Sequence, residues 1–492
     1  MIWTIRLRPL AFALVCLCYL TTGYGQPMPP APYGVLPTER QLRWQEMDMY
    51  VLVHFTPTTF ENKEWGFGDA NPAIFNPTQF DARQILRAVK AGGFRGLILV
   101  TKHHDGFALW PTATTDYNIS KSPWRNGKGD MVKEFADAAR AEGLKFGVYC
   151  SPWDRNNPRY GTPAYVQDYR NQLRELYTRY GSLFMSWHDG ANGGDGYYGG
   201  AKETRKIDRT TYYGWDSTWT MTRSMQPQAT IFSDVGWDVR WVGNERGEAA
   251  ETSWATYTPE PLPGRNGVGP GDVRDELNPM GTRNGKYWMP AECDVPLRKG
   301  WFFHPEENNT VRNPQQLFDL YLKSVGRGAC LDIGIAPDTR GLLHENDVLA
   351  LKNFGTLLQT TFANDLAKKA SFTPSNVRGG SKKFGTQHLV DKDRYSYWAT
   401  DDSVTTPSLE LSWTSPQTIR YVRIRENIQL GQRIEALELD AWQDGQWTRV
   451  AAATSIGACR ILALPNPVQT TRLRLRITQS PVCVALGEVG VF

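Results

Sequence analysis

Short apolar segments alternate with amphipathic helical segments from residue 49 to residue 338, and this alternation most constrains the fold. Seven segments are predicted to be buried strands: MYVLVHF (49–55), GLILVTKHHDGF (96–107), LKFGVYCSPWD (144–154), SLFMSWHDG (182–190), ATIFSDVG (229–236), VRWVGNE (239–245) and LDIGIAPD (331–338). Helical periodicity lies between them, as in DARQILRAVKAGGF (81–94), after Asp130, around Leu173 and from Pro314. The alternation predicts parallel strands closed into a (β/α)₈ barrel, and a doubly wound open sheet is the alternative.

Residues at the carboxyl ends of the predicted strands favour the barrel. They are His54, His103, His104, Tyr149, Trp153, Asp189 and Glu245. In a barrel the carboxyl ends of all strands meet at one mouth, where active sites lie. Each of these residues alone is compatible with a structural turn, but their recurrence on successive strands predicts a shared site.

The sequence pattern changes after residue 365, where apolar and polar residues alternate and turn residues separate the segments. Examples are SLELSWTSPQTIRYVRIRENI (408–428), IEALELDAWQDGQWTRVA (434–451) and TTRLRLRITQ (470–479). This period of two predicts an antiparallel β-sandwich. The expected organisation is a signal peptide (1–25), a proline-rich leader (26–40), a catalytic barrel (41–362) and a sandwich domain (363–492).

The first 25 residues have the features of an export signal. Arg6 and Arg8 precede the apolar stretch PLAFALVCLCYL (9–20), and TTGYGQP (21–27) supplies small residues and a break, with cleavage expected near Gly25. The apolar stretch is too short to span a bilayer comfortably, and no later stretch is long enough for a transmembrane segment. We therefore expect an exported protein, either periplasmic or secreted.

Charge and cysteine content argue against two other classes of protein. Removing Arg6 and Arg8 lowers the number of basic residues from 55 to 53, against 51 acidic residues, and no basic run stands out. Nucleic-acid binding therefore has little support. The cysteines after the signal, Cys150, Cys293, Cys330, Cys459 and Cys483, form no C-x-x-C pair and so argue against a zinc site. Buried free thiols are a plainer expectation than a Cys459–Cys483 disulfide.

Several motifs between residues 40 and 360 resemble one family of enzymes. They are VLVHFTPTTF, NKEWG, VTKHHDGFALWPT, FGVYCSPWD, HDGANG, VRWVGNE and GIAPDTRGLL. Together they resemble glycoside hydrolase family 29, the α-L-fucosidases, and the DGANG and WVGNE forms resemble its α-1,3/1,4-specific branch. LVDKDRYSYWATDD (389–402) and CVALGEVGVF (483–492) resemble the ends of discoidin-like (F5/8 type C) modules, which often bind sugars. A domain that only buttresses the barrel is an equal alternative.

A retaining glycosidase needs two carboxyl groups about 5–5.5 Å apart, one as nucleophile and one as acid/base. Asp189 ends a predicted strand beside glycines and matches the family's nucleophile, although an Asp-Gly pair also forms turns. For the acid/base, GNERGEAAET (243–252) offers Glu245, Glu248 and Glu251. Glu245 is nearest the strand end and matches the resemblance, so we predict that it is the acid/base and that its pKa is raised by the Asp189 charge and by apolar walls.

The resemblance also implies a set of fucose-binding residues. The set is His54, Glu64, Trp65, His103, His104, Tyr149 and Trp187. Arg240 matches the family more loosely and is alternatively a surface salt-bridge residue, and Trp301 is added to the set as a wall residue. Trp187, Trp301 and Phe302 are candidates for an apolar wall against the fucose methyl group, and Trp241 and Trp254 for the wall beside the acid. His103 and His104 are expected on opposite faces of a strand, a poor arrangement for chelation, so no metal ion or other cofactor is expected at the site. Asp391 and Asp393 are candidate ligands for a structural calcium ion.

The sequence therefore predicts an exported, retaining, exo-acting α-L-fucosidase that removes α-1,3/1,4-linked fucose from branched, Lewis-type glycans through a fucosyl-enzyme intermediate. Three alternatives remain open at this point. One is a glycan-binding protein without turnover, one is a metal-dependent hydrolase that uses the histidines, and one is a glycosidase of another specificity on the same barrel.

Overall fold

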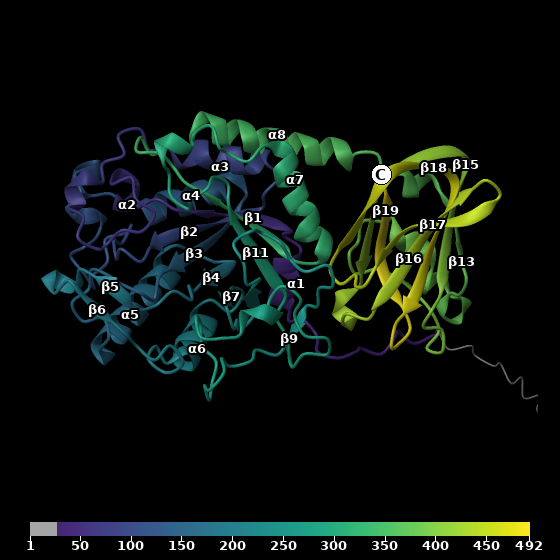
Figure 1. Ribbon diagram of the computed structural model, residues 1–492, viewed down its shortest axis with the longest axis horizontal. Helices are drawn as coiled ribbons and strands as arrows, with labels where there is room; N and C mark the ends of the chain where they lie inside the picture. Colours follow the sequence, from purple (N-terminus) through teal and green to yellow (C-terminus); the bar gives the residue numbers. More distant parts are fainter. Residues whose placement is uncertain (1–26) are drawn as a thin grey trace, which may run out of the picture.

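The computed structural model describes residues 27–492, so the predicted export signal lies outside the described residues. Eight parallel strands form a closed barrel in the order β1-β12-β11-β8-β7-β4-β3-β2 (Figure 1). They are β1 (Met49–Val53), β2 (Gly96–Lys102), β3 (Lys145–Cys150), β4 (Met185–Trp187), β7 (Thr230–Ser233), β8 (Val239–Trp241), β11 (Ala291–Pro296) and β12 (Cys330–Ile335). The predicted closed barrel is confirmed, and the open-sheet alternative is wrong.

α-Helices follow every barrel strand except β7 and β8, and α1 precedes β1. The helices are α1 (Glu39–Gln45), α2 (Pro57–Phe60), α3 (Ala82–Ala91), α4 (Met131–Glu142), α5 (Pro163–Arg179), α6 (Trp215–Met225), α7 (Pro314–Lys323) and α8 (Glu345–Thr361). Only residues 234–238 connect β7 to β8, which leaves no room for a covering helix. Residues 242–290 connect β8 to β11 and contain the small hairpin β9 (Thr256–Tyr257) and β10 (Tyr287–Trp288). A second small hairpin, β5 (Gly194–Gly196) and β6 (Glu203–Arg205), follows β4.

The sequence pattern located seven of the barrel strands but did not predict β11. Its sequence, AECDVP, carries Glu292 and Asp294, which alternate with Cys293 and Val295 of the outer hydrophobic core and so face the barrel interior. Asp332 on the neighbouring strand also faces inwards, opposite Asp294. Burial raises the pKa of all three carboxyl groups, that of Glu292 to about 7. These acidic residues interrupt the apolar run by which a buried strand is recognised in sequence.

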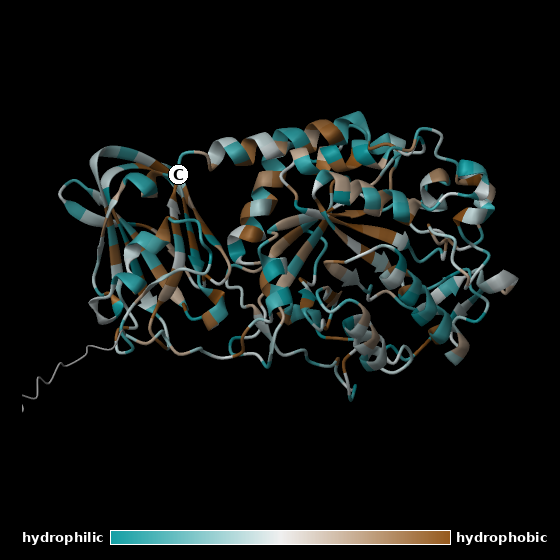
Figure 2. Cartoon of the chain, turned by 180° about the vertical axis from the view of Figure 1, so that it is seen from behind, coloured by the Kyte–Doolittle hydropathy of each residue, from teal (hydrophilic) through white to brown (hydrophobic). Residues whose placement is uncertain are grey.

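The predicted strands end earlier in the structure than the sequence pattern suggests. β2, for example, ends at Lys102 rather than at Phe107, and β4 ends at Trp187 rather than at Gly190. The polar residues of interest therefore lie in the loops just beyond the strand ends. Colouring by hydropathy shows brown apolar strands at the centre of the barrel and mixed surface helices around it (Figure 2).

The C-terminal domain is an antiparallel β domain with its own hydrophobic core. Its strands are β13 (Ser371–Pro374), β14 (Trp398–Ala399), β15 (Ser408–Glu426), β16 (Ala436–Gln443), β17 (Gln446–Ala453), β18 (Arg460–Gln479) and β19 (Ala485–Val491). The long strands β15 and β18 pair along most of their length, interrupted by register shifts. β13 pairs with the first part of β15 and β19 with its last part, so β15 links the two ends of the domain.

The proline-rich leader runs along the C-terminal domain before the chain enters the barrel (Figure 1). Tyr33 N–H donates to the Leu430 carbonyl at 2.9 Å, and Arg378 and Arg433 of the C-terminal domain donate to leader carbonyls. Helix α1 then begins at Glu39, within the predicted leader. No described helix is long and apolar enough to cross a membrane. The five cysteines after the predicted signal are buried free thiols, as expected.

Candidate active site

Asp189 lies two residues beyond the end of β4, at the mouth of the barrel. Its Oδ2 accepts a hydrogen bond from the Tyr149 hydroxyl at 2.8 Å, and its Oδ1 accepts one from the Ala191 N–H at 2.6 Å. Burial raises the pKa of Asp189, and these two hydrogen bonds oppose that rise. The side chain keeps 22% exposure, so a ligand in the mouth can reach the carboxylate.

Glycine at position 190 lets the chain turn closely behind Asp189. A Cβ at Gly190 would lie 2.4 Å from Oδ2 of Asp234, far inside van der Waals contact. Asp234 follows β7 as Asp189 follows β4, and its Oδ2 accepts a hydrogen bond from the Gly271 N–H. Burial, together with the charges of Asp189 and Asp275, raises the pKa of Asp234 to about 7. A second carboxyl group therefore supports the turn that carries Asp189.

Three histidine rings lie together beside Asp189. The centroids of His54 and His103 are 5.5 Å apart, and those of His103 and His104 are 4.1 Å apart. Nδ1 of His104 is 2.7 Å from the Ser151 hydroxyl, and its Nε2 is 3.8 Å from Oδ2 of Asp189. Burial lowers the pKa of His54 and of His104 to about 3, and that of His103 well below its usual value, so all three rings are neutral near pH 7.

The expectation that His103 and His104 point to opposite faces of a strand is wrong. β2 ends at Lys102, so both residues lie in the following turn and the rule of alternation along a strand does not apply to them.

Aromatic side chains form the wall of the mouth. Tyr149 packs on Trp187 with ring centroids 4.9 Å apart, and Trp187 stacks on Phe232 at 4.2 Å. The Trp187 indole N–H donates to Oε1 of buried Glu292 at 2.7 Å, which fixes the orientation of the ring. Trp301 and Phe302 each pack against His54 with centroids 5.3 Å away.

Trp65 and Glu64 lie at the rim of the same mouth. The Trp65 ring is 4.9 Å from that of His104 and is 48% exposed, which leaves a free aromatic surface. The carboxylate of Glu64 accepts hydrogen bonds from the N–H groups of Trp301 and Phe302 and lies 3.0 Å from Nε2 of His304. Glu64 therefore holds the segment that carries Trp301.

Glu245 lies beyond the end of β8, exposed at the rim. Partial desolvation of its carboxyl group raises the pKa of Glu245, a hydrogen bond with Trp301 opposes that rise, and the charges of Asp189 and Glu64 add to it. The other two carboxylates of this loop have basic partners. Glu248 pairs with Lys323 at 2.7 Å, and Glu251 pairs with Arg327 at 2.7 Å. Within the described chain, Glu245 is thus the carboxylate of this loop that is electrostatically coupled to Asp189.

Arg240 is not at the mouth, which corrects the sequence-based assignment. Its neighbours in β8, Val239 and Trp241, face the barrel interior, so the Arg240 side chain faces outwards. There it is fully buried, and its guanidinium donates to the carbonyls of Asn278, Met289 and Trp254. This arginine organises the segment between β8 and β11, and no part of it is available to a ligand.

Trp254 lies with Arg240 on the outer side of β8 and so does not wall the mouth. Trp241, the other candidate, does lie on the interior side. Its indole N–H donates to Oδ1 of buried Asp294 at 2.7 Å.

Comparison with known proteins identifies the family. Residues 32–361 match the sequence model of the family described as alpha-L-fucosidase. The chain belongs to the α-L-fucosidase family. It is 37% identical over 486 residues to alpha-L-fucosidase 1 of Arabidopsis thaliana, which covers 98% of this chain and 92% of that protein.

Solved structures of fucosidases share the whole architecture. A glycoside hydrolase 29 family member from an unknown rumen bacterium is 40% identical with a TM-score of 0.82, covering 94% of this chain and 78% of that one. A Ruminococcus gnavus family 29 fucosidase in complex with fucose is 28% identical with a TM-score of 0.84, covering 95% of this chain and 97% of that one. The barrel and the C-terminal β domain of this α-L-fucosidase are therefore shared with relatives of the same family.

Sequence reasoning missed several groups that shape the site of this fucosidase. Glu292 and Asp294 accept hydrogen bonds from the indole N–H groups of Trp187 and Trp241. Asp234 lies against Gly190, directly after Asp189, and accepts a hydrogen bond from the Gly271 N–H. The pattern FSDVG resembles WHDG, with an aspartate within two residues of a strand end and a glycine close by, and this was the available signal for Asp234. Glu292 and Asp294 gave no such signal, because only the closed barrel shows that they face Trp187 and Trp241.

The proposed calcium ligands in the C-terminal domain of the fucosidase are engaged by their own loop. Asp391 accepts hydrogen bonds from the Ser396 hydroxyl at 2.7 Å and the Asp393 N–H at 2.9 Å, and Asp393 accepts one from the Tyr395 N–H at 2.9 Å. No group of three or more His, Cys, Asp or Glu within residues 27–492 is arranged to hold a metal ion.

Proposed function

We propose that this α-L-fucosidase is an exo-acting, retaining enzyme in which Asp189 is the nucleophile and Glu245 the acid/base. Asp189 attacks the anomeric carbon of a terminal fucose while Glu245 protonates the departing glycosidic oxygen. Glu245 then deprotonates a water molecule, which attacks the fucosyl-enzyme ester and releases fucose with the original configuration. Glu245 makes both proton transfers and Asp189 supplies the nucleophile, so the proposed reaction uses no cofactor.

The observation that carries this proposal is that two carboxyl groups follow barrel strands at the mouth and that the charge of Asp189 acts on Glu245. Asp189 is held in place by Tyr149 and Ala191 and is reachable by a ligand. Its negative charge contributes to the raised pKa of Glu245, as a general acid requires. The histidine beside Asp189, His104, is neutral, so it adds no positive charge that would cancel the effect of Asp189 on the pKa of Glu245.

The walls of the mouth match the two faces of a fucose ring. We assign the neutral rings of His54, His103 and His104, with Tyr149, to hydrogen bonds with sugar hydroxyls. Nδ1 atoms of His54 and His103 have no hydrogen-bond partner in the described part of the chain. We assign Trp187, Trp301 and Phe302 to the methyl side of the sugar and Trp65 to the rim. The fucose bound in the structure of the related Ruminococcus gnavus enzyme supports this choice of ligand.

The linkage, the location and the role of the C-terminal domain are parts of the same proposal. We infer α-1,3/1,4-linked fucose on branched glycans from the DGANG and WVGNE motifs, and export to the periplasm or medium from residues 1–25. The discoidin-like motifs of the C-terminal domain support a contribution to glycan presentation.

The test is release of fucose from a Lewis-type trisaccharide and from 2′-fucosyllactose by wild type, Asp189→Ala and Glu245→Gln. We expect release from the trisaccharide alone. Asp189→Ala should lower it by at least about 1,000-fold, and Glu245→Gln by about 100- to 10,000-fold. Glu248→Gln is the matched control, because Glu248 is paired with Lys323, and it should stay close to wild type.

Early NMR spectra of the product decide the stereochemistry. The α-anomer of L-fucose should appear first if the enzyme retains configuration, and the β-anomer appearing first would exclude the proposed intermediate. Full activity in Glu245→Gln with loss in Glu248→Gln would move the acid/base role to Glu248. Equal release from both sugars would overturn the linkage.

A further inference from the structure

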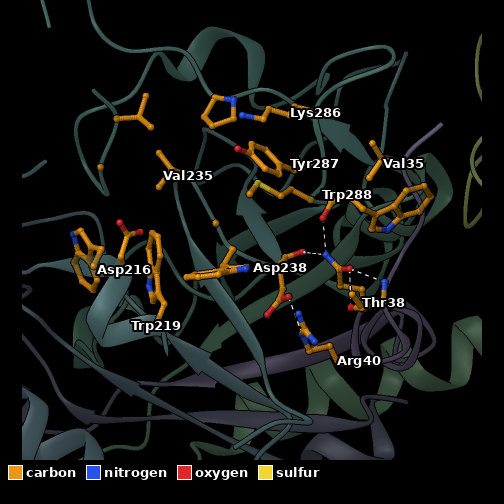
Figure 3. A pocket seen from close by; sticks show the side chains of 18 of the residues that line it. Val35, Thr38, Arg40, Asp216, Trp219, Val235, Asp238, Lys286, Tyr287 and Trp288 are labelled. Carbon is orange, nitrogen blue, oxygen red and sulfur yellow. Dashed lines mark hydrogen bonds and ion pairs between the residues drawn. The ribbon is translucent and has the colours of Figure 1, made fainter. Parts of the chain in front are cut away.

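The missing helix between β7 and β8 leaves a large cavity on the side of the barrel. It has a volume of about 730 Å³ and lies between α6, the β7–β8 connection, the β9–β10 hairpin and the end of the leader (Figure 3). In a complete (β/α)₈ barrel a helix would cover this part of the sheet. The active-site carboxylates and histidines do not line it. The cavity is therefore a separate feature of the fold.

Several aromatic side chains lie in the walls of this cavity. Trp215 and Trp219 of α6 stack with centroids 5.5 Å apart, and Trp219 meets Trp237 edge to face at 5.7 Å. Trp237 and Tyr287 are each 41% exposed, although large aromatic side chains are usually buried. Exposed rings gathered in a concave site of 300–1,000 Å³ are typical of a ligand site rather than of an ordinary surface.

The polar groups at the rim indicate the chemistry of the ligand. Asp216 is exposed on the first turn of α6, and it makes no ion pair within residues 27–492. Lys286 lies on the opposite side, 5.0 Å from the centre of the Tyr287 ring (Figure 3). Arg40 and Asp238 also line the cavity, but they pair with each other at 2.8 Å. The remaining acidic and basic groups suit an uncharged molecule with many hydroxyls, because the hydroxyls can donate to Asp216 and accept from Lys286. A pyranose offers both these hydroxyls and a C–H face that packs on an aromatic ring.

One loop separates the cavity from the active site. Gly269 lines the cavity, and Pro270 and Gly271 directly after it contact the active-site side. The Pro270 carbonyl accepts a hydrogen bond from Asn192 at 3.0 Å, and a Cβ at Gly271 would lie 2.0 Å from the Gly190 carbonyl oxygen. A saccharide in the cavity would therefore lie beside the loop that carries Asp189 without occupying the fucose pocket.

We propose that this cavity is a second carbohydrate site, which takes a neutral saccharide unit on Trp237 and Tyr287. It holds an unfucosylated part of a large glycan, while a terminal fucose occupies the barrel mouth. The site is independent of the roles proposed for Asp189 and Glu245.

The test uses lacto-N-tetraose, a neutral tetrasaccharide without fucose, titrated into the full-length mature enzyme by calorimetry. We expect wild type and Trp237→Phe to bind it, and Trp237→Ala and Tyr287→Ala to weaken binding at least fivefold. Leu349→Ala, an exposed apolar residue on α8 outside the cavity, is the control and should bind as wild type. Hydrolysis of 4-nitrophenyl α-L-fucoside should be the same in all these variants, which shows that they are folded.

The possible outcomes separate this site from the active site and from other occupants. No binding by wild type, or equal binding by both alanine variants, would overturn the proposal. The proposal would also be overturned if both alanine variants lost aryl-fucoside hydrolysis while their thermal stability stayed unchanged. The cavity would then be part of the catalytic site. If the wild type were a dimer and the Trp237→Ala variant a monomer, the surface would instead be an interface with a second copy of the chain, and the proposal would be overturned. A wild type that binds the tetrasaccharide through Trp237 but hydrolyses no fucoside would refute the proposed function alone.

Discussion

The ionisation of Asp189 depends on a few individual side chains. Burial favours its protonated form, and two hydrogen-bond donors favour the carboxylate, namely the Ala191 N–H and the Tyr149 hydroxyl. His104 is 3.8 Å away but neutral, so it contributes no charge. Of these influences, the Tyr149 hydroxyl is the one that a single conservative substitution removes without disturbing the backbone.

We predict that Tyr149→Phe raises the pKa of Asp189 and lowers kcat/KM by about 10- to 100-fold. A hydrogen bond to a charged group is worth about 1.5–3 kcal/mol, which corresponds to this change in rate. The bond stabilises the carboxylate, so its loss shifts the acidic limb of the kcat/KM profile to higher pH. The profile for an aryl fucoside between pH 4 and pH 8 measures both effects.

Tyr177→Phe is the control for this prediction. The Tyr177 hydroxyl is also buried, 2.7 Å from the Ser186 hydroxyl and away from the Asp189 carboxylate, so its loss should leave the acidic limb in place. An unchanged acidic limb in Tyr149→Phe would show that the hydroxyl does not act on Asp189.

At the scale of elements, the segment between β8 and β11 carries Glu245 without an α-helix of its own to support it. The C-terminal domain supports it instead. Arg460, 2% exposed, donates to the Glu251 carbonyl at 2.5 Å and to the Ser455 carbonyl at 2.7 Å. Gln432 exchanges hydrogen bonds with the Ala255 N–H at 2.8 Å and the Ser253 carbonyl at 3.0 Å. The loop that carries Glu245 is thus docked on the C-terminal domain.

We predict that Arg460→Met loosens this loop and lowers kcat for a natural glycan about tenfold, within the range of general acid catalysis. Hydrolysis of an aryl fucoside should change less than about twofold, because its good leaving group needs little protonation. The comparison of kcat for the two substrates measures the effect. Arg449→Met, which removes an exposed arginine of the same domain, is the control. Equal losses on both substrates would argue against a positioning role for Arg460.

At the scale of the whole molecule, an ion-pair network joins the barrel to the C-terminal domain. Asp48, just before β1, lies 2.9 Å from Arg394 and 3.5 Å from Arg425, and Arg425 also pairs with Glu488 at 3.1 Å. Burial alone would raise the pKa of Asp48, but Arg425, Arg394 and Arg95 bring it below its usual value. The charged form of Asp48 therefore stabilises the folded molecule.

We predict that Asp48→Asn lowers the free energy of unfolding by about 3 kcal/mol at pH 7, as for other broken buried pairs. The folded pKa lies below the unfolded value of about 3.9. This contribution is therefore present in full above the unfolded value, begins to decrease below it, and is lost as the pH falls through the lower, folded pKa. Thermal unfolding at pH 7 and pH 3.5 should show a large difference from wild type at pH 7 and a smaller one at pH 3.5.

Asp116→Asn is the control for the network, because Asp116 pairs with Lys121 while 95% exposed. It should change the free energy of unfolding by less than about 1 kcal/mol. The role assigned to the Asp48 charge would be contradicted if Asp48→Asn lowered the free energy of unfolding by the same amount at both pH values.

The sequence by itself determined the barrel and the residues at its mouth, because both depend on local periodicity. Short apolar runs separated by helical patterns specify parallel strands, and a residue just beyond a strand end must lie at the mouth once the barrel closes. His54, His104, Tyr149 and Asp189 could therefore be placed together before their contacts were known. The motifs that carried the family resemblance lie at the same positions.

Only the tertiary structure decided where outward-facing and non-periodic residues lie. Arg240 matched a family position but faces away from the mouth, since the alternation within β8 directs its neighbours inwards. β11 was not predicted, because Glu292 and Asp294 are tolerated inside the barrel only as protonated or hydrogen-bonded groups. The partners of Glu248 and Glu251, the docking of their loop on the C-terminal domain and the aromatic cavity all depend on contacts between distant segments. Such contacts leave no periodic signal in the sequence.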